Sequence, residues 1–220
     1  MWSAPLYAII HLTEDARLNV FKKRFFLSMI DAKPDQVVSI LAAARRCYLA
    51  NGISATGMKD VAASADLARS TLYRYFPGRD DLLVATIMEE MIELNDCIRK
   101  RLARYPHPAD QVVEGLLVAI KEIPRRPLLH AVFASEGDSR ARRVIWSSGA
   151  IVSFGEELMD HVIQPARDAD LLQDAVRPEI LIEWVYRLLL SFLTLPSNWV
   201  KSDVQLRATL HALLVPVLLK

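Results

Sequence analysis

Glycine and cysteine are scarce in this sequence, which has seven glycines and two cysteines among its 220 residues. Alternating runs of β-branched residues, the usual mark of strands, are also hard to find. The two cysteines, Cys47 and Cys97, fall in stretches with helical spacing, which argues against a disulfide framework. We therefore expect a helical chain in a reducing compartment, the cytoplasm.

Long apolar runs are missing too. The longest candidate for a membrane span, residues 180–195, is interrupted by Glu183, Arg187, Ser191 and Thr194. The apolar start of the chain, residues 1–12, lacks the preceding basic residues of a secretory signal. The basic–aromatic cluster at residues 22–26 could touch a membrane surface, but stable anchoring usually needs a second signal. We expect no membrane partner.

Patterns typical of catalytic and metal sites are absent as well. The five histidines stand at positions 11, 107, 130, 161 and 211, without the spacing of metal ligands. The chain has no glycine-rich phosphate loop, nucleophile elbow or paired-cysteine motif. An enzyme on a helical scaffold therefore stays a remote alternative, and the sequence predicts no catalytic residue, metal or cofactor.

Helical periodicity is what the sequence does contain. Hydrophobic residues make up 52% of the chain and recur at spacings of three and four. We predict an all-α fold of about nine helices: one over residues 35–51, two short ones between Thr56 and Tyr75, and others at 79–104, 109–123, 127–134, 139–163, 178–195 and 202–219. Prolines and turn residues separate them.

The predicted helices divide into three parts: an N-terminal extension at 1–34, a helix-turn-helix domain at 35–80, and a helical body at 81–220. Residues 1–80 hold eleven Lys and Arg against seven Asp and Glu, a net charge of +4, whereas 81–220 hold sixteen against nineteen, a net charge of −3. A basic first part suits contact with phosphate, although a difference of this size is also common by chance. The extension could be an arm or a consequence of start-site choice, since Met29 is a second candidate start.

Residues 35–80 carry the pattern of a three-helix DNA-binding unit. Asp35 is the expected N-cap of the first helix, and Asn51-Gly52 is expected to close it. Thr56 is the expected cap of the second helix, and a tight turn at 65–67 leads to the third. We expect Leu67, Leu72 and Phe76 to face inward, and Arg69, Ser70, Thr71 and Arg74 to face the bases of a major groove.

At these residues the sequence resembles the TetR family of helix-turn-helix regulators. The matching stretch from Thr56 to Leu83 reads TGMKDVAASADLARSTLYRYFPGRDDLL, and with the first helix the resemblance covers about residues 36–83. Two positions depart from the family pattern: Asp66 replaces the usual turn Gly, and Ala68 replaces a capping Ser. Asp tolerates left-handed backbone, so we expect an intact turn, whereas Ala cannot cap the third helix.

The resemblance implies a role for each matching residue. Thr56, Tyr73 and Arg79 would contact phosphate, while Arg69, Ser70, Thr71 and Arg74 would lie nearest the bases. Tyr73 could instead be a packing residue and Arg79 a solvated one, and we expect Arg45 and Arg46 to be solvated. The partner would be double-stranded DNA with a near-palindromic operator, whose half-site centres are about 34–36 Å, or a multiple, apart.

In this family the helical body binds a small molecule, and the last two helices pair across a two-fold axis. Candidate pocket residues are Met88, Met91, Asn95, His130, Phe133, Trp146, Phe154 and Trp184, with ordinary core or surface as the alternative for each. The lack of a charged cluster among them favours an apolar or amphipathic effector. A homodimer interface is expected to include Leu188, Leu190, Phe192, Leu206, Leu210, Leu213, Leu214 and Val217, with a monomeric core as the alternative.

The sequence as a whole predicts a DNA-binding transcriptional regulator, with release of a repressor from its operator by a small ligand as the leading interpretation. An activator and a repressor that its ligand stabilises on DNA both stay open. The operator, the regulated genes and the effector are not encoded in any pattern of the chain.

Overall fold

The computed structural model describes residues 34–134, 138–173 and 177–220, and the predicted N-terminal extension lies almost wholly outside these residues. The described residues form eleven α-helices and one 3₁₀-helix, which confirms the all-α prediction. Strand-like pairing among them is limited to one isolated antiparallel bridge between Leu172 and Leu219. In the same residues, no helix is both long and apolar enough to span a membrane.

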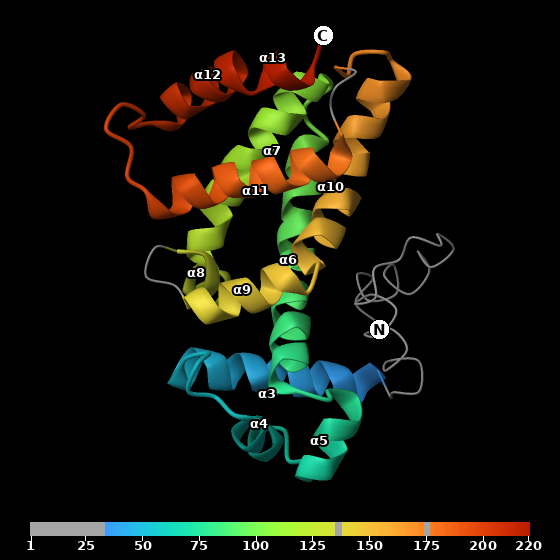
Figure 1. Ribbon diagram of the computed structural model, residues 1–220, viewed down its shortest axis with the longest axis vertical. Coiled ribbons are helices and arrows are strands. Elements are labelled where there is room, and N and C mark those ends of the chain that lie inside the picture. The colour runs from blue at the N-terminus through green and yellow to red at the C-terminus, as the bar shows by residue number, and fades with distance from the viewer. Residues whose placement is uncertain (1–33, 135–137, 174–176) are drawn as a thin grey trace. The chain divides into compact units, whose positions relative to one another are not determined.

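The helices fall into two compact units. Of the described residues, unit 1 comprises 34–93 and 138–151, and unit 2 comprises 94–134, 152–173 and 177–220. Unit 1 holds α3 (Pro34–Asn51), α4 (Met58–Ser64), α5 (Arg69–Tyr75), the first part of α6 (Arg79–Leu102) and α9 (Ser139–Ser147) (Figure 1). Unit 2 holds the rest of α6, α7 (Pro108–Glu122), η1 (Ile123–Arg125), α8 (Pro127–Phe133), most of α10 (Ala150–Asp168), α11 (Pro178–Thr194), α12 (Asp203–Leu213) and α13 (Val215–Leu218).

The boundary between the units differs from the one expected at residue 80. Unit 1 extends along α6 to Glu93, and α9, which we placed in the body, belongs to it. Helix α9 has one buried side, since Ala141 and Ile145 are fully buried, and it also carries three arginines. The chain therefore enters unit 1 twice, once through residues 34–93 and again through 138–151.

Helix α3 follows the predicted amphipathic stripe. Val37, Ile40, Leu41 and Ala44 are all buried, and the helix packs against α4. The helix begins at Pro34, so Asp35 stands in its first turn, and its prediction as the N-cap is wrong. The C-terminal prediction is confirmed: Gly52 follows the helix with φ +85°, and its N–H donates to the Tyr48 carbonyl at 2.9 Å.

The single helix expected over 139–163 is two helices, α9 and α10. The break falls at Ser148 and Gly149, where Gly149 takes φ +75°, a conformation that glycine adopts at little cost. Helix α10 then continues past Pro165, where we expected an end, to Asp168. Asp170 closes it instead, with φ +54° and with a Leu171 N–H to Ala166 carbonyl bond of 2.8 Å.

The last predicted helix is also divided, because α12 ends at Leu213 and a short α13 starts at Val215. Pro216 lacks a backbone N–H, which accounts for the interruption. Splitting the helices predicted at 139–163 and 202–219 turns the expected nine helices into the eleven α-helices of the described residues.

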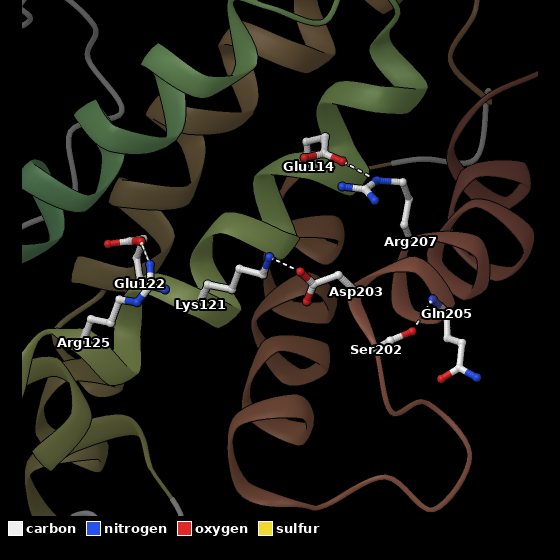
Figure 2. A network of polar contacts seen from close by, with 8 residues as sticks. All are labelled: Glu114, Lys121, Glu122, Arg125, Ser202, Asp203, Gln205 and Arg207. Atoms are coloured by element: carbon white, nitrogen blue, oxygen red, sulfur yellow. Dashed lines mark hydrogen bonds and ion pairs between the residues drawn. The ribbon is translucent and has the colours of Figure 1, made fainter.

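Helix α12 is joined to α7 within unit 2 by two ion pairs and one histidine contact. Arg207 Nε lies 2.5 Å from Oε1 of Glu114, and Lys121 pairs with Asp203 (Figure 2). His211 Nε2 lies 3.3 Å from Oδ1 of Asp110. The partners run in opposite order along the two helices, so α12 lies antiparallel to α7. On the apolar side, Leu206 and Leu210 of α12 and its C-cap residue Leu214 are buried.

Candidate DNA-binding site

The turn between α4 and α5 is closed by two backbone hydrogen bonds. The Leu67 N–H donates to the Ala62 carbonyl at 2.9 Å, and the Asp66 N–H donates to the Ala63 carbonyl at 3.3 Å. Asp66 takes φ +53°, so the turn is a Schellman motif with Asp in the position that usually holds Gly. The expected tolerance of Asp for left-handed backbone is confirmed, and the angle between the two helices is fixed without a glycine.

The start of α4 differs from the prediction. The N-cap is Gly57, whose N–H donates to Oδ2 of Asp60 at 2.8 Å. Thr56 is 1% exposed, and its hydroxyl donates to the carbonyls of Cys47 (3.1 Å) and Gly52 (2.8 Å). Both its assignment as the cap and its assignment as a phosphate contact are therefore wrong for this arrangement, because the hydroxyl proton is already engaged inside the protein. Thr56 instead fastens the end of α3 to the loop that follows.

Helix α5 has the two faces that a recognition helix needs. Leu72 and Phe76 are buried as expected, and Leu67 is half-buried. Tyr73 is 42% exposed, and the other exposed residues of the helix are Arg69, Ser70 and Arg74, with Thr71 half-buried beside them. The N-cap residue is Ala68, and, as expected, no side chain caps the helix. The outer face is thus polar and basic along its whole length.

Two arginines of the site are held in place by neighbouring groups. The Arg74 guanidinium lies over the Tyr75 ring, 5.5 Å from its centroid, which orients the cation without neutralising it. Arg79 is half-buried, and its Nη2 donates to the Ile53 carbonyl at 2.5 Å. Arg79 therefore ties the first turn of α6 to the loop after α3. A guanidinium has five N–H donors, so others are left for a phosphate.

Two further arginines, Arg45 and Arg46, which we expected to be solvated, contact residues on neighbouring helices. Arg45 on α3 places its Nε 2.7 Å from a carboxylate oxygen of Glu90, a residue of α6 that is 1% exposed. Arg46 donates to the Ser64 carbonyl at the end of α4, at 3.1 Å. No local sequence pattern indicates either contact, since both partners come from other helices. Together they join α3 to α4, the helix that precedes α5, and to α6, the helix that follows it.

Residues 40–86 of the chain match the sequence pattern of the bacterial regulatory proteins of the tetR family. The matched segment contains both short helices, the turn and the first third of α6. The chain therefore resembles the TetR family over its DNA-binding segment. It is accordingly a DNA-binding transcriptional regulator.

Known proteins agree with this resemblance to the TetR family. A helix-turn-helix transcriptional regulator of Mycobacterium tuberculosis is 25% identical over 178 residues, which cover 81% of this chain and 83% of the relative. FadR of Bacillus halodurans has a TM-score of 0.55 at 17% identity, covering 83% of this chain and 96% of its own. A TetR-family regulator of Pectobacterium atrosepticum has a TM-score of 0.54 at 22% identity, covering 84% and 95%. The two structures show that the likeness in fold covers 83% and 84% of this chain.

The predicted effector residues are divided between the units. Met88, Met91 and Trp146 lie in unit 1, and the other five lie in unit 2. Of those five, His130 and Trp184 are exposed and Phe154 is half-buried, while Phe133 and Asn95 are buried. Phe133 makes an edge-to-face contact with Tyr186, a residue missed by the sequence reasoning, with ring centroids 6.3 Å apart. The pocket itself stays a prediction.

Asn95 has the least ordinary environment of the predicted effector residues. It lies on α6 within unit 2 and is 2% exposed, and its Oδ1 atom has no hydrogen-bond partner among the described residues. Ile98 and Leu102, which follow it at helical spacing, approach Gly115 of α7. An amide oxygen desolvated in such apolar surroundings is costly unless something donates to it.

The predicted dimer residues also separate into two groups. Leu206, Leu210 and Leu214 are buried inside a single copy by the packing of α12 on α7, so they offer no free surface to a partner. That part of the interface prediction needs correction. Leu213 is 69% exposed, Val217 is exposed too, and Leu188, Leu190 and Phe192 are half-buried. Exposed apolar residues that we did not assign are Ile180, Leu195, Trp199 and Val204.

Proposed function

We propose that this protein is a homodimeric repressor that binds a near-palindromic operator and leaves it when a small apolar or amphipathic effector binds unit 2. The DNA-binding part of this proposal rests on the outer face of α5. Arg69, Ser70, Tyr73 and Arg74 are exposed on this face, while the opposite face of the helix is buried in the core. A helix with this division of faces fits a major groove about 12 Å wide.

The exposed residues divide by the chemistry of their side chains. Arg69 and Arg74 can donate two parallel hydrogen bonds to the O6 and N7 atoms of guanine, so we assign base reading to them, with Ser70 and Thr71 beside them. Tyr73 and Arg79 suit phosphate oxygens, which fix register without reading sequence. Thr56 is removed from the set because its hydroxyl is engaged internally.

A second copy is supported by the exposed apolar residues of α11 to α13. Leu213 and Val217 are exposed on α12 and α13. Ile180 and Trp184 are exposed one turn apart on α11, and Leu195 is exposed directly after the end of that helix. A soluble monomer rarely exposes so many large apolar residues on neighbouring helices. A two-fold partner would bury them and would set the spacing of the two α5 helices.

The effector class follows from the interior of unit 2. Its buried residues are almost all apolar, and the Asn95 Oδ1, which has no partner among the described residues, can accept a hydrogen bond from a hydroxyl or an amide N–H. An amphipathic molecule meets both conditions. FadR of Bacillus subtilis was solved with stearoyl-CoA and FadR of Thermus thermophilus with lauroyl-CoA, at TM-scores of 0.54 and 0.55. Acyl-CoA thioesters, which carry amide N–H groups, are therefore the first compounds to test.

The regulator would act by binding rather than by catalysis, and it would act where the chromosome lies, in the cytoplasm. The experiment that tests the proposal is selection of bound fragments from genomic and random duplex pools by the purified full chain. A repressor of this kind enriches one near-palindromic site and loses it when the correct effector is added. Recovery of no common site would refute DNA reading by α5. Tighter binding with effector would instead indicate a ligand-stabilised regulator.

A further inference from the structure

Three segments of unit 1 meet beside the proposed DNA-binding site. They are the loop after α3, represented by Ile53 and Ser54, the first turn of α6 with Arg79 and Asp80, and the start of α9. The first two are joined by the 2.5 Å hydrogen bond from Arg79 Nη2 to the Ile53 carbonyl. This loop leads directly to Gly57, the N-cap of α4. The loop therefore sets where the helix-turn-helix begins.

Helix α9 joins both of the other segments through its first residues. The Ser54 hydroxyl donates to Oδ2 of Asp138, and Arg140 Nη2 lies 2.7 Å from Oδ1 of Asp80. Each pair of segments is thus connected by one contact, and the three contacts close a triangle. We refer to these six residues as the three-way junction: Ile53, Ser54, Arg79, Asp80, Asp138 and Arg140. Arg140 is 60 residues from Asp80 in the sequence.

The carboxylate of Asp138 has two tasks in the junction. Its Oδ1 accepts from the Ala141 N–H at 2.9 Å and so caps α9, while its Oδ2 accepts from Ser54. Since one rigid group serves both bonds, the position of the α9 N-terminus and the position of the loop are fixed together. Ala141 and Ile145 of α9 are buried. Their burial holds α9 in place, so the helix can act as a fixed support for the loop.

We propose that Asp138 and Arg140 are positioning residues for DNA binding, although they lie outside the helix-turn-helix and outside the segment that matches the TetR pattern. They hold the loop that starts α4 and the turn that carries Arg79, a phosphate donor in our proposed function, on which this inference rests. Arg140 and Asp80 are both about half exposed, so their pair contributes modestly to stability. Its effect is on geometry, because a misplaced Arg79 cannot meet a phosphate at hydrogen-bond distance.

The test compares Arg140→Gln, Ser54→Ala and the double variant with the wild-type full chain. The probe is a fluorescent duplex recovered from a random pool by the wild-type protein, and its affinity is measured at several salt concentrations. We expect each single variant to weaken binding by about two- to five-fold, the range of an exposed polar contact. The dependence of log Kd on log salt should stay unchanged, because no phosphate contact is removed. Arg79→Ala should instead reduce that slope by about one.

Arg143→Gln is the matched control, because it removes the same charge from an exposed position of the same helix. It should bind as the wild type does, and all variants should keep the wild-type helical spectrum. In an Asp80→Asn background, Arg140→Gln should have no further effect. Wild-type affinity of Arg140→Gln and Ser54→Ala would overturn the inference, as would a reduced salt slope of Arg140→Gln, which would make Arg140 a phosphate contact itself. If the wild-type chain selects no duplex, the proposed function fails first.

Discussion

Arg207 on α12 places its Nε 2.5 Å from the Oε1 of Glu114 on α7, and the Glu114 side chain is almost completely buried. Burial alone would raise the pKa of the Glu114 carboxyl. The hydrogen bonds from Arg207 and Tyr105, together with the charges of Arg207 and Arg101, outweigh it and lower the pKa. The contact therefore favours the ionised carboxylate and joins the C-terminal part of unit 2 to α7.

Removing the cation should leave a buried carboxylate without its main partner. We expect Arg207→Ala to lower the free energy of unfolding by about 1–3 kcal/mol, measured by urea denaturation. Arg125→Ala is the control, because its pair with Glu122 is an exposed contact within one turn of chain and is worth about 0.2–0.5 kcal/mol. Equal losses in the two variants would contradict the role assigned to the Glu114–Arg207 pair.

The same pair predicts a pH dependence. Because the pKa of Glu114 is lower in the folded chain than in the unfolded one, the pair stabilises the fold above the unfolded pKa. That contribution is lost as the pH falls through the acid range below about 4.3. The stability difference between wild type and Arg207→Ala should accordingly shrink on acidification and be largest near neutral pH. A difference that is constant with pH would show that Arg207 acts through packing alone.

Gly155 on α10 lies against Ile182 on α11 within unit 2. A Cβ added at Gly155 would stand 3.2 Å from Cγ1 of Ile182 and closer still to its Cγ2. We expect Gly155→Ala to destabilise unit 2 by about 1–3 kcal/mol through overpacking, despite the better helix propensity of alanine. In an Ile182→Ala background the same change should be neutral or stabilising. Thermal denaturation of the four proteins measures the coupling, and additive effects would refute the close approach.

Two leucines of α12, one exposed and one buried, provide a test of the proposed dimer. Leu213 is exposed in one copy, so Leu213→Asp should leave the helical spectrum intact and shift the protein from dimer to monomer in sedimentation. Leu210 is 3% exposed, so Leu210→Asp should instead destabilise the chain itself, because a charge is buried without a partner. Wild-type protein that sediments as a monomer at micromolar concentration would contradict the assembly directly.

Asn95 offers a prediction for the effector. Asn95→Leu removes the desolvated amide oxygen and keeps a similar volume, so the free chain should be equally or more stable. A ligand that donates to Oδ1 should at the same time lose about ten-fold or more in its effect on DNA affinity. The measurement is duplex affinity across a panel of acyl-CoA thioesters, free fatty acids and coenzyme A, for wild type and variant. An unchanged response to the active compound would place the effector elsewhere.

The sequence predicted the helix-turn-helix well because its signals are local. Asp66 in the left-handed turn, Gly52 after α3 and the inward positions of Leu72 and Phe76 depend on residues a few positions apart. Thr56 was misassigned because the family pattern marks a helix start, and the hydroxyl of Thr56 has two competing acceptors that only the folded loop brings near it.

Contacts between segments far apart in the chain could not be predicted from the sequence. Nothing near Arg45 indicates that its partner is Glu90, and nothing near Arg140 indicates Asp80. The break at Gly149 was overlooked because the apolar spacing of residues 139–163 continues across it. Leu206, Leu210 and Leu214 have the spacing of an interface helix, and the sequence cannot tell whether such a stripe meets a second copy or, as here, helix α7 of the same chain.

In the proposed function, helix α5 reads DNA through its exposed face. The most direct test of this role is the affinity of wild type, Arg69→Ala, Arg74→Ala and Tyr73→Ala for the selected duplex and for a scrambled duplex of equal length. Each arginine variant should lose about 1–3 kcal/mol on the selected duplex, a factor of roughly 5 to 150, and less on the scrambled one. Tyr73→Ala should lose similar amounts on both, as expected of a phosphate contact. Wild-type affinity and preference in all three variants would show that another surface of the protein binds the operator.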